Sequence, residues 1–439
     1  MKRNNIFALA LCFLCSCTAS TSIFKKAANQ LQKDSVISTG YIGVSMYEPA
    51  TGKYLFQKNA NKYFIPASNT KLFTLYVGMK YLEDSLTGIK YAKTEDSLFV
   101  FPTGDPTFLH RDFVRQPVYD FIKNSDRQIV FVQASKQPSK YGRGWSWDDM
   151  NESFMPQRNQ FPMFGNILEM EFAKLSPEAF DTKRLEPFLP DVIINYAADS
   201  IAQESKIVRN QNDNIYQVIF SGKDSLIRKS VPFETNGIAT TVSYLKQMLQ
   251  NDQINVSEIS TDVPLQKIKT QSSDSLFKAM MYKSDNFFAE QILLMCSNIK
   301  MGCFDEEEMI ASLLMNEFKS IPQKPRWVDG SGLSRYNLFS PNDFIFILNK
   351  IDAEFGEGRL RGLLPTGGKG TLKNFCVPDS GYIYAKTGSM SNIFCISGEL
   401  ITKKKKKLLF SILLNNYYGS SAVVKNAIEN YLITIRKEY

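Results

Sequence analysis

Histidine is nearly absent from the 439-residue sequence, and this excludes several classes of enzyme. The single histidine, His110, cannot supply a metal site that needs two imidazole ligands. A serine–histidine–aspartate triad would have to use His110, which ends the loop-like stretch 104–110. We therefore expect a packing or surface role for His110, and we expect a hydrolase built on this sequence to use a different general base.

Cysteine is also scarce, and its spacing argues against zinc and redox motifs. The sequence has seven cysteines, and none of the four that follow residue 17 belongs to a C-x-x-C pair. Cys296 and Cys303 are close enough in sequence to form a disulfide in an exported protein. Buried free thiols are the equal alternative. We expect no metal site.

Long hydrophobic runs are absent as well. The apolar run 6–14 follows Lys2 and Arg3 and is too short to span a bilayer as a stable helix. A short basic start before such a run is typical of a secretory signal. We therefore assign residues 1–22 to a signal peptide or lipoprotein tether, and we expect the protein to be exported.

The end of this segment indicates lipidation. Residues 14–17, Leu-Cys-Ser-Cys, resemble a bacterial lipobox in which Cys17 becomes the lipidated first residue. Cys15 is an unusual residue two places earlier, and ordinary cleavage after Ala19 is the alternative. We favour lipidation because the small residue Ser16 precedes Cys17. We expect a periplasmic or cell-envelope lipoprotein, attached to a membrane through a lipid anchor at Cys17.

Charge and aromatic content fit an envelope protein. The sequence has 52 basic and 44 acidic residues, a net charge of +8, which fits an anionic envelope or polymer better than a neutral partner. The one charge run, Lys403–Lys407, lies between two predicted strands. We interpret it as a solvated hairpin tip rather than a docking site for anionic surfaces. The 20 tyrosines and 32 phenylalanines indicate core packing and sugar-facing clefts, so we expect no nucleic-acid partner.

The two ends of the mature chain predict a mixed α/β domain. Residues 41–47 alternate in polarity, and residues 54–56 follow a turn as the second strand of a hairpin. Pro66 then precedes a helical pattern over residues 69–82. Near the other end we expect three antiparallel strands and a helix, at residues 382–387, 391–400, 408–415 and 422–435. The third of these strands is apolar on both faces, so we expect it in the centre of the sheet.

The middle of the chain has a different pattern. Residues 93–263 contain short strand-like pieces, such as 128–133, that are broken by Pro, Asn, Gln and Asp. This pattern predicts an inserted, mostly β region of unassigned role. The predicted domains are a signal or tether (1–22), an α/β domain (23–92 and 264–439) and the inserted region (93–263).

Ser68 and Lys71 form a Ser-x-x-Lys pair that could combine a nucleophile with its base. A serine hydroxyl is a poor nucleophile at neutral pH and needs a base within hydrogen-bond reach. Residues i and i+3 share one helix face, so Lys71 is expected to point toward the Ser68 hydroxyl. The positive end of the helix dipole would disfavour the proton on Lys71 and favour a Ser68 alkoxide.

The Ser-x-x-Lys motif alone decides nothing. The chain contains it five times, beginning at Ser22, Ser68, Ser243, Ser275 and Ser297. Only Ser68 follows a Pro-Ala break and opens a helix after a hairpin. Ser68 is therefore distinguished from the other four serines by its sequence context, which includes two further motifs.

The two further motifs follow Ser68 in order. Ser284-Asp285-Asn286 lies between two apolar helical stretches, and Lys386-Thr387-Gly388-Ser389 ends a predicted strand. Taken singly, a helix cap at Ser68, a turn and a hairpin end would explain the three elements. Together they match the Ser-x-x-Lys, Ser-Asp-Asn and Lys-Thr-Gly set of class A β-lactamases and penicillin-binding proteins, which favours catalysis.

A wider set of segments resembles one branch of these proteins. Residues 66–72, Pro-Ala-Ser-Asn-Thr-Lys-Leu, resemble the nucleophile segment of the low-molecular-mass class C penicillin-binding proteins, the D-Ala-D-Ala carboxypeptidase/endopeptidase family with a large insertion. The long separation of Ser68 from Ser284 favours these peptidases over class A β-lactamases. Further family landmarks resemble residues 104–107, 144–149, 329–334 and 370–372.

The resemblance implies a fold and an activity. The fold is an α/β (α+β) β-lactamase/transpeptidase-like domain, an antiparallel sheet flanked by helices, with a mostly β inserted region. The activity is a serine-type D-Ala-D-Ala carboxypeptidase, a DD-endopeptidase or both, acting on peptidoglycan stem peptides through an acyl-enzyme on Ser68. The resemblance implies no cofactor, and it implies inhibition by β-lactam antibiotics.

The resemblance also implies residue roles. Ser68 is the nucleophile and Lys71 is its base, while Ser284 relays a proton toward the leaving amine with help from Lys71 and Lys386. The backbone N–H groups of Ser68 and Ser389 form the oxyanion hole. The residues that bind substrate are Asn286, Thr387, Gly388 and Ser389.

Two alternatives stay open at this point. The first is a β-lactamase or D-amino-acid amidase on the same scaffold, which fast penicillin turnover without D-Ala release would favour. The second is a non-catalytic peptidoglycan-binding lipoprotein, which muropeptide binding without acylation would favour. The intact set of motif residues argues against the second.

Overall fold

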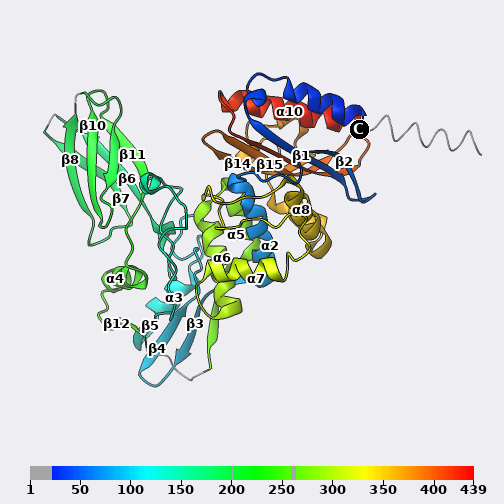
Figure 1. Cartoon of the computed structure of the whole chain (residues 1–439). Helices are drawn as coiled ribbons and strands as arrows, with labels where there is room; N and C mark the ends of the chain where they lie inside the picture. The colour runs from blue at the N-terminus through cyan, green and yellow to red at the C-terminus, as the bar shows by residue number, and fades with distance from the viewer. Residues whose placement is uncertain (1–21, 177, 200, 259–263) are drawn as a thin grey trace, which may run out of the picture. The chain divides into compact units, whose positions relative to one another are not determined.

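The computed structural model describes residues 22–176, 178–199, 201–258 and 264–439, so the predicted signal segment and the lipidation site Cys17 lie outside the described residues. The chain divides into two compact units (Figure 1). Unit 1 comprises Met1–Tyr76, Phe277–Asp285 and Ser312–Tyr439, and unit 2 comprises Val77–Leu276 and Asn286–Ala311. Within the described part of the chain, no helix has both the length and the apolar character needed to cross a membrane.

Unit 1 is built on a five-stranded antiparallel sheet with the strand order β14-β15-β16-β1-β2. The sheet confirms the predicted hairpin, and it confirms the central position of the last strand, whose residues after Lys407 are all buried. The strands are β1 (Tyr41–Glu48), β2 (Lys53–Lys58), β14 (Ile383–Met390), β15 (Ile393–Ile401) and β16 (Lys407–Asn415).

Helices cover both faces of this sheet because alternate residues of each strand point to opposite sides. Val44 of β1 belongs to a buried cluster with the helical residues 22–32 and α10. Its neighbour Ser45 points the other way, and its Oγ donates to Asn342 Oδ1 of α8 at 2.7 Å. The predicted sheet flanked by helices is therefore confirmed. Besides the helical residues 22–32, unit 1 wholly contains the helices α8 (Pro341–Phe355), α9 (Glu357–Leu363) and α10 (Ser421–Glu438).

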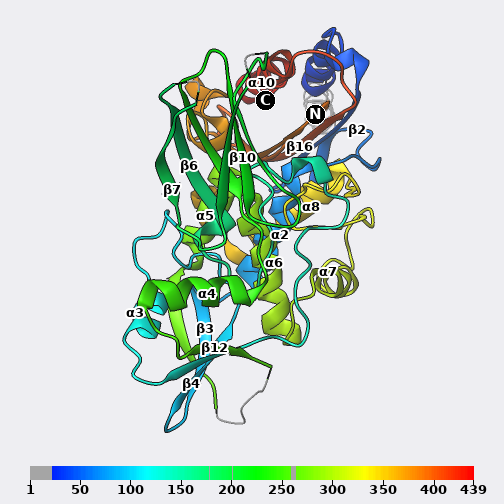
Figure 2. The ribbon, with the colours of Figure 1, turned by 90° about the vertical axis from the view of Figure 1, so that its left-hand side faces the viewer.

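Among its described residues, unit 2 forms three sheets, with the orders β12-β5-β4-β3-β13, β8-β10-β9 and β11-β6-β7. Helix α4 lies across the first sheet (Figure 2), and its Val242 and Leu245 share a buried cluster with Ile129 and Ile254. The elements are β3 (Ser85–Lys93), β4 (Ser97–Pro102), α3 (Pro117–Lys123), β5 (Gln128–Val132), β6 (Ile167–Lys174), β7 (Phe180–Glu186), β8 (Ile193–Asp199), β9 (Lys206–Arg209), β10 (Ile215–Ser221), β11 (Leu226–Pro232), α4 (Ile238–Leu249), β12 (Ile254–Ser257), β13 (Gln266–Ser272) and α6 (Asn286–Met301).

The middle region is mostly β, as predicted. Residues 93–263 lie within unit 2, which extends beyond them on both sides to include β3, β13 and α6. Three helices have residues assigned to both units: α2 (Lys71–Tyr81), α5 (Ser273–Lys283) and α7 (Glu306–Met315). The mixed α/β class is confirmed, and the assignment of residues 93–263 as an insertion stays a prediction.

The histidine and the cysteines have structural environments in unit 1 and unit 2. The His110 ring contacts those of Phe288 and Phe113, at centroid distances of 4.9 and 5.7 Å, and its Nδ1 accepts from the Asp112 N–H at 3.2 Å. The four described cysteines are free thiols, so Cys296 and Cys303 form no disulfide. Burial raises the pKa of the Cys296 thiol, which makes it an unreactive core residue.

Candidate active site

The nucleophile segment forms a short turn that leads into a buried helix. Ser68 lies on a 3-10 turn, Ala67–Thr70, and α2 begins at Lys71, so the predicted helical pattern starts with a tighter turn than expected. Ala67 has a φ of 47°, a left-handed conformation that is strained for a residue with a side chain. The sharp turn leaves Ser68 partly exposed while Lys71 is fully buried.

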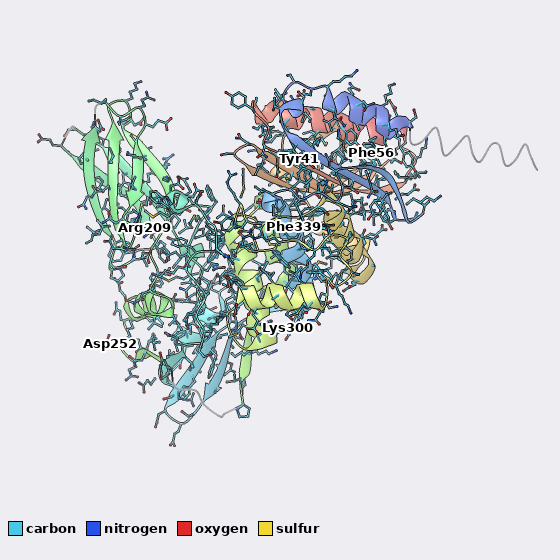
Figure 3. All side chains as sticks on the ribbon, in the orientation of Figure 1. Tyr41, Phe56, Arg209, Asp252, Lys300 and Phe339 are labelled. Atoms are coloured by element: carbon cyan, nitrogen blue, oxygen red, sulfur yellow. The ribbon has the colours of Figure 1, made fainter. Side chains whose placement is uncertain are left out.

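Aromatic packing fixes the start of α2 in unit 1. The Phe73 ring contacts the rings of Phe318, Trp327, Phe339 and Phe344 at centroid distances of 4.8 to 5.8 Å. Figure 3 labels Phe339, which lies below the strands of the unit 1 sheet in this view. Each such ring pair adds about 0.5–1.5 kcal/mol beyond its buried area. The cluster therefore holds Lys71, two residues before Phe73, in a fixed position.

Lys71 is positioned by two oxygen atoms. Its Nζ donates to the Ser68 Oγ at 3.0 Å and to the Ser331 carbonyl oxygen at 2.7 Å. The first contact confirms that Ser68 and Lys71 face each other, as the i and i+3 spacing predicts. The second contact comes from a distant part of the sequence, and we did not predict it.

The loop that carries Ser331 is rigid because of the Asp329 carboxylate. This carboxylate accepts from the Gly332 N–H at 2.8 Å, the Ser334 N–H at 2.6 Å and the Asn337 Nδ2 at 2.7 Å. The loop is also tied to α2, because the Thr74 Oγ1 donates to the Gly330 carbonyl at 2.6 Å. In the sequence, the segment 329–334 is recognisable only as a family landmark, and its Asp-Gly-Ser-Gly sequence is a signal for such a turn.

Gly332 is required where this loop meets the nucleophile turn. Its φ is +79°, and a Cβ at this position would lie 1.9 Å from the Ala67 carbonyl oxygen. We expect Gly332→Ala to cost about 2–4 kcal/mol of unfolding free energy and to slow acylation of Ser68 at least about tenfold. Gly52→Ala is the matched control, because Gly52 has a φ of +66° with nothing within 4 Å.

Urea unfolding and the rate of labelling by a fluorescent penicillin would check this prediction. Gly52→Ala should lose only about 1 kcal/mol, the cost of the backbone conformation, and should keep its labelling rate. Equal effects of the two substitutions would show that the Gly332 loop does not position the nucleophile turn.

Ser284 and Lys386 form a second serine–lysine pair. Lys386 lies on β14, is fully buried, and its Nζ donates to the Ser284 Oγ at 2.8 Å and to the Thr387 carbonyl at 2.6 Å. Burial, and then the charge of Lys71, lower the pKa of Lys386 well below its usual value of 10.5. Ser284 has a φ of 57° in the tight turn between α5 and α6.

Gly388 brings β14 against the nucleophile turn. A Cβ on Gly388 would lie 2.6 Å from the Pro66 carbonyl oxygen and 2.9 Å from the Ser68 backbone nitrogen, so only glycine fits this approach. The next residue, Ser389, is exposed, and Thr387 is half-buried. The structure therefore brings together six of the predicted residues in unit 1: Ser68, Lys71, Ser284, Lys386, Thr387 and Gly388, with Ser389 next in the chain.

Asn286 belongs to unit 2, where it begins α6. Its Nδ2 donates to the Phe154 carbonyl at 2.9 Å. One turn further along α6, Glu290 forms a fully buried ion pair with Arg158 at 3.3 Å. A loop of unit 2 thus fixes the first turns of α6, and the predicted role of Asn286 in binding substrate stays a prediction.

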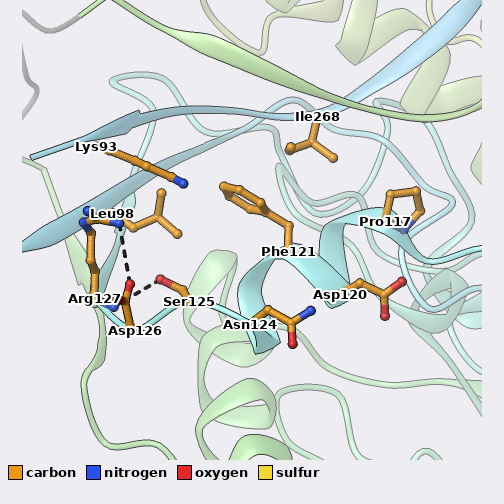
Figure 4. Close-up of a pocket in the computed structure, with 10 residues that line it drawn as sticks. All are labelled: Lys93, Leu98, Pro117, Asp120, Phe121, Asn124, Ser125, Asp126, Arg127 and Ile268. Atoms are coloured by element: carbon orange, nitrogen blue, oxygen red, sulfur yellow. Dashed lines mark hydrogen bonds and ion pairs between the residues drawn. The ribbon is translucent and has the colours of Figure 1, made fainter.

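A separate cavity of about 500 Å³ lies in unit 2 and contains no motif residue (Figure 4). Its cations are already engaged: Arg127 Nε donates to the Thr94 carbonyl at 3.0 Å, and Lys93 lies 5.4 Å from the centre of the Phe121 ring. We assign no role to this cavity. Among the described residues, no group of three or more His, Cys, Asp or Glu side chains could hold a metal ion.

Comparison with known proteins agrees with this geometry. The chain is 25% identical over 394 residues to D-alanyl-D-alanine carboxypeptidase DacB of Haemophilus influenzae, covering 77% of this chain and 78% of the relative. It resembles the crystal structure of penicillin binding protein 4 (dacB) from the same organism with a TM-score of 0.76 at 20% identity, covering 94% and 99% of the two chains. A structure of that protein complexed with a β-lactam matches with a TM-score of 0.72 at 19% identity and the same coverage.

The match to a family model is the broadest finding. Residues 24–438 match the model described as the D-Ala-D-Ala carboxypeptidase 3 (S13) family, which is nearly the whole described chain. The chain therefore belongs to the D-Ala-D-Ala carboxypeptidase 3 (S13) family, and the prediction of a serine-type D-Ala-D-Ala carboxypeptidase is confirmed.

Proposed function

We propose that Ser68 attacks the carbonyl carbon of a D-alanyl peptide bond while Lys71 accepts the Ser68 proton. One observation supports this assignment above all others: a fully buried amine lies 3.0 Å from the Ser68 Oγ and is held there by the Ser331 carbonyl. A base within this distance can take the proton as the serine oxygen attacks.

The second lysine makes a neutral amine available. Two buried ammonium groups repel each other, and the pKa of Lys386 is lowered by burial and by the Lys71 charge. Lys386 can therefore lose its proton at a pH well below that of an exposed lysine.

Ser284 is the proposed route for the proton to the leaving group. Its hydroxyl accepts a hydrogen bond from Lys386 at 2.8 Å, so the proton that Ser284 gives to the departing amine can be replaced by the one that Lys71 took from Ser68, with Lys386 as the relay. The peptide C–N bond then breaks, D-Ala or a cross-linking amine leaves, and the acyl group stays on Ser68. Water hydrolyses this ester and restores the serine.

Most of the groups that we propose to bind substrate lie on β14. The Ser68 backbone nitrogen lies against Gly388, which supports a pair of N–H donors from Ser68 and Ser389 for the oxyanion. Such a donor is typically worth about 3–4 kcal/mol in the transition state. The hydroxyls of Thr387 and Ser389 are the proposed ligands of the terminal carboxylate, and Asn286 is the proposed partner of the peptide backbone.

Peptidoglycan stem peptides are the substrates, and β-lactams are expected to acylate Ser68. Mass spectrometry of purified muropeptides before and after incubation would test this. Loss of terminal D-Ala shows carboxypeptidase activity, loss of cross-links shows endopeptidase activity, and Ser68→Ala is the control. Unchanged muropeptides with the native protein, together with rapid penicillin hydrolysis, would contradict the proposal.

The proposed location is the cell envelope, with a lipid anchor at Cys17. A short basic start, a short apolar run and a lipobox-like end support it. Labelling of growing cells with radioactive palmitate should mark the native chain and leave Cys17→Ser unmarked. Equal labelling of both proteins, or labelling of neither, would rule out this anchor.

A further inference from the structure

The charge run 403–407 divides into two groups in the structure. Lys406 lies 3.2 Å from the Glu48 carboxylate, and Lys407 lies 2.8 Å from Glu357, so these two lysines are neutralised within unit 1. Lys403, Lys404 and Lys405 are exposed, and none of the three has an ion pair with a described residue. The run is therefore not a uniformly solvated tip, because two of its members fix the hairpin and three point to solvent.

Contacts bring this hairpin next to both ends of the described chain. The Lys403 N–H donates to the Arg436 carbonyl at 2.9 Å, and the Lys404 Nζ donates to the Glu438 carbonyl at 3.4 Å. The Tyr439 ring lies 5.1 Å from the Phe24 ring, between centroids. Figure 1 shows the first helix and the end of α10 side by side.

Three further lysines are exposed at the same place. Lys25 and Lys26 follow Phe24 directly, and Lys437 precedes Glu438 at the end of α10. Together with the three lysines of the hairpin they form the basic end of unit 1: Lys25, Lys26, Lys403, Lys404, Lys405 and Lys437. None of the six forms an ion pair with any residue that the structure describes. The acids at this end are Glu48, which is paired with Lys406, and the exposed Glu438, so the basic side chains outnumber the acidic ones.

The basic end lies where the chain leaves toward its proposed anchor. Four residues lie between Cys17 and Ser22, and the five steps from one to the other span at most about 18 Å when the chain is extended. Clusters of lysines near a membrane are attracted to anionic headgroups over about a Debye length, which is 8–10 Å at physiological salt. The anchor and the basic end would therefore act on the same surface.

In place of the solvated tip that the sequence alone favours for residues 403–407, we propose that the basic end of unit 1 docks on a membrane through anionic lipid headgroups. The argument rests on charge complementarity, on the position of residue 22, and on the export proposed above. It does not depend on the catalytic assignment. The docking would hold unit 1 against the lipid surface by one face instead of leaving it loosely tethered.

Vesicle binding tests this proposal without help from a lipid anchor. The full chain with Cys17→Ser is mixed with phosphatidylcholine vesicles, with or without phosphatidylglycerol, and bound protein is separated by flotation. We expect binding only to the vesicles that contain phosphatidylglycerol, and release at about 0.5 M salt, where the Debye length is only a few ångströms. Equal binding to both vesicles, or to neither, would overturn the proposal.

Two sets of substitutions test which part of the protein surface binds the vesicles. Replacing Lys403, Lys404 and Lys405 by glutamine should weaken binding on the order of 100-fold, since each lysine near such a surface contributes about fivefold. The matched control replaces Lys53, Lys62 and Lys223, three exposed lysines elsewhere, and should change binding less than about threefold. Equal losses in the two sets would show an effect of net charge alone and would refute a defined docking face.

A soluble polymer distinguishes binding to a lipid surface from binding to other anions. Poly(glycerol phosphate) carries the same phosphate chemistry without a bilayer. If it binds the chain at matched phosphate concentration while vesicles do not, the partner is a polymer and the membrane proposal is wrong. Penicillin labelling of all variants should stay at the wild-type rate, because none of the replaced lysines belongs to the catalytic site.

Discussion

Replacing Ser68 with alanine is expected to abolish both D-Ala release and covalent penicillin labelling. The substitution removes the Ser68 oxygen, to which the buried Lys71 amine donates at 3.0 Å, so no acyl-enzyme can form there. Loss of a nucleophile of this kind typically lowers turnover by at least about a thousandfold. Release of D-Ala from a pentapeptide, followed by mass spectrometry, measures the first effect, and gel fluorescence measures the second.

Ser243→Ala is the matched control for this experiment. Ser243 also begins a Ser-x-x-Lys sequence, but it is exposed on α4, within unit 2. It should keep full activity and full labelling. A Ser68→Ala protein that is still labelled at the native rate would show that another residue is the nucleophile.

The second large effect is expected for Lys386→Met, in both activity and stability. The substitution removes the donor to the Ser284 Oγ and the charge that couples to Lys71, so acylation should fall at least about 100-fold. It also removes the cost of burying an ammonium group, which is large for an unpaired charge. The stability of the variant relative to the native protein should therefore depend on pH.

The sign of that dependence follows from the direction of the pKa shift. The folded-state pKa of Lys386 lies well below the unfolded value, so between the two values the unfolded chain binds more protons. In that window the stability of the native protein rises with pH, up to about pH 10.5. The Lys386→Met variant lacks this pH-dependent contribution to stability. If its Tm exceeds that of the native protein, the difference should be largest at low pH and should shrink as pH rises.

Thermal unfolding of both proteins at a series of pH values measures this trend. The absolute difference at one pH also contains the lost hydrogen bonds to Ser284 and Thr387, so the trend is the quantity to compare. Lys223→Met, an exposed control, should show a difference in Tm that is constant with pH. A constant difference for Lys386→Met would contradict a lowered pKa.

Much of the site could be predicted because its residues are close in sequence or belong to short motifs. The Ser68–Lys71 contact follows from i and i+3 spacing on one turn. The central β16 follows from an apolar pattern on both faces. These signals are local, and local patterns determine the strands and helices more reliably than the contacts between them.

The contacts that were missed join distant parts of the chain. The Ser331 carbonyl reaches Lys71 across 260 positions, and no pattern around Ser331 indicates which amine its carbonyl will meet. Likewise, the pairing of Lys406 with Glu48 depends on how β1 and the last hairpin close together. The sequence predicts a helical pattern from residue 69, whereas residues 67–70 form a 3-10 turn, because such a turn and the first turn of an α-helix have similar sequence patterns.

The central claim is that catalysis proceeds through an acyl-enzyme on Ser68. The most direct measurement is to trap the protein with a slowly released β-lactam, digest it, and locate the added mass by tandem mass spectrometry. We predict a single adduct on the peptide that contains Ser68, at the Ser68 side chain. An adduct on Ser284, on any other residue or on none, with active native protein, would contradict the account.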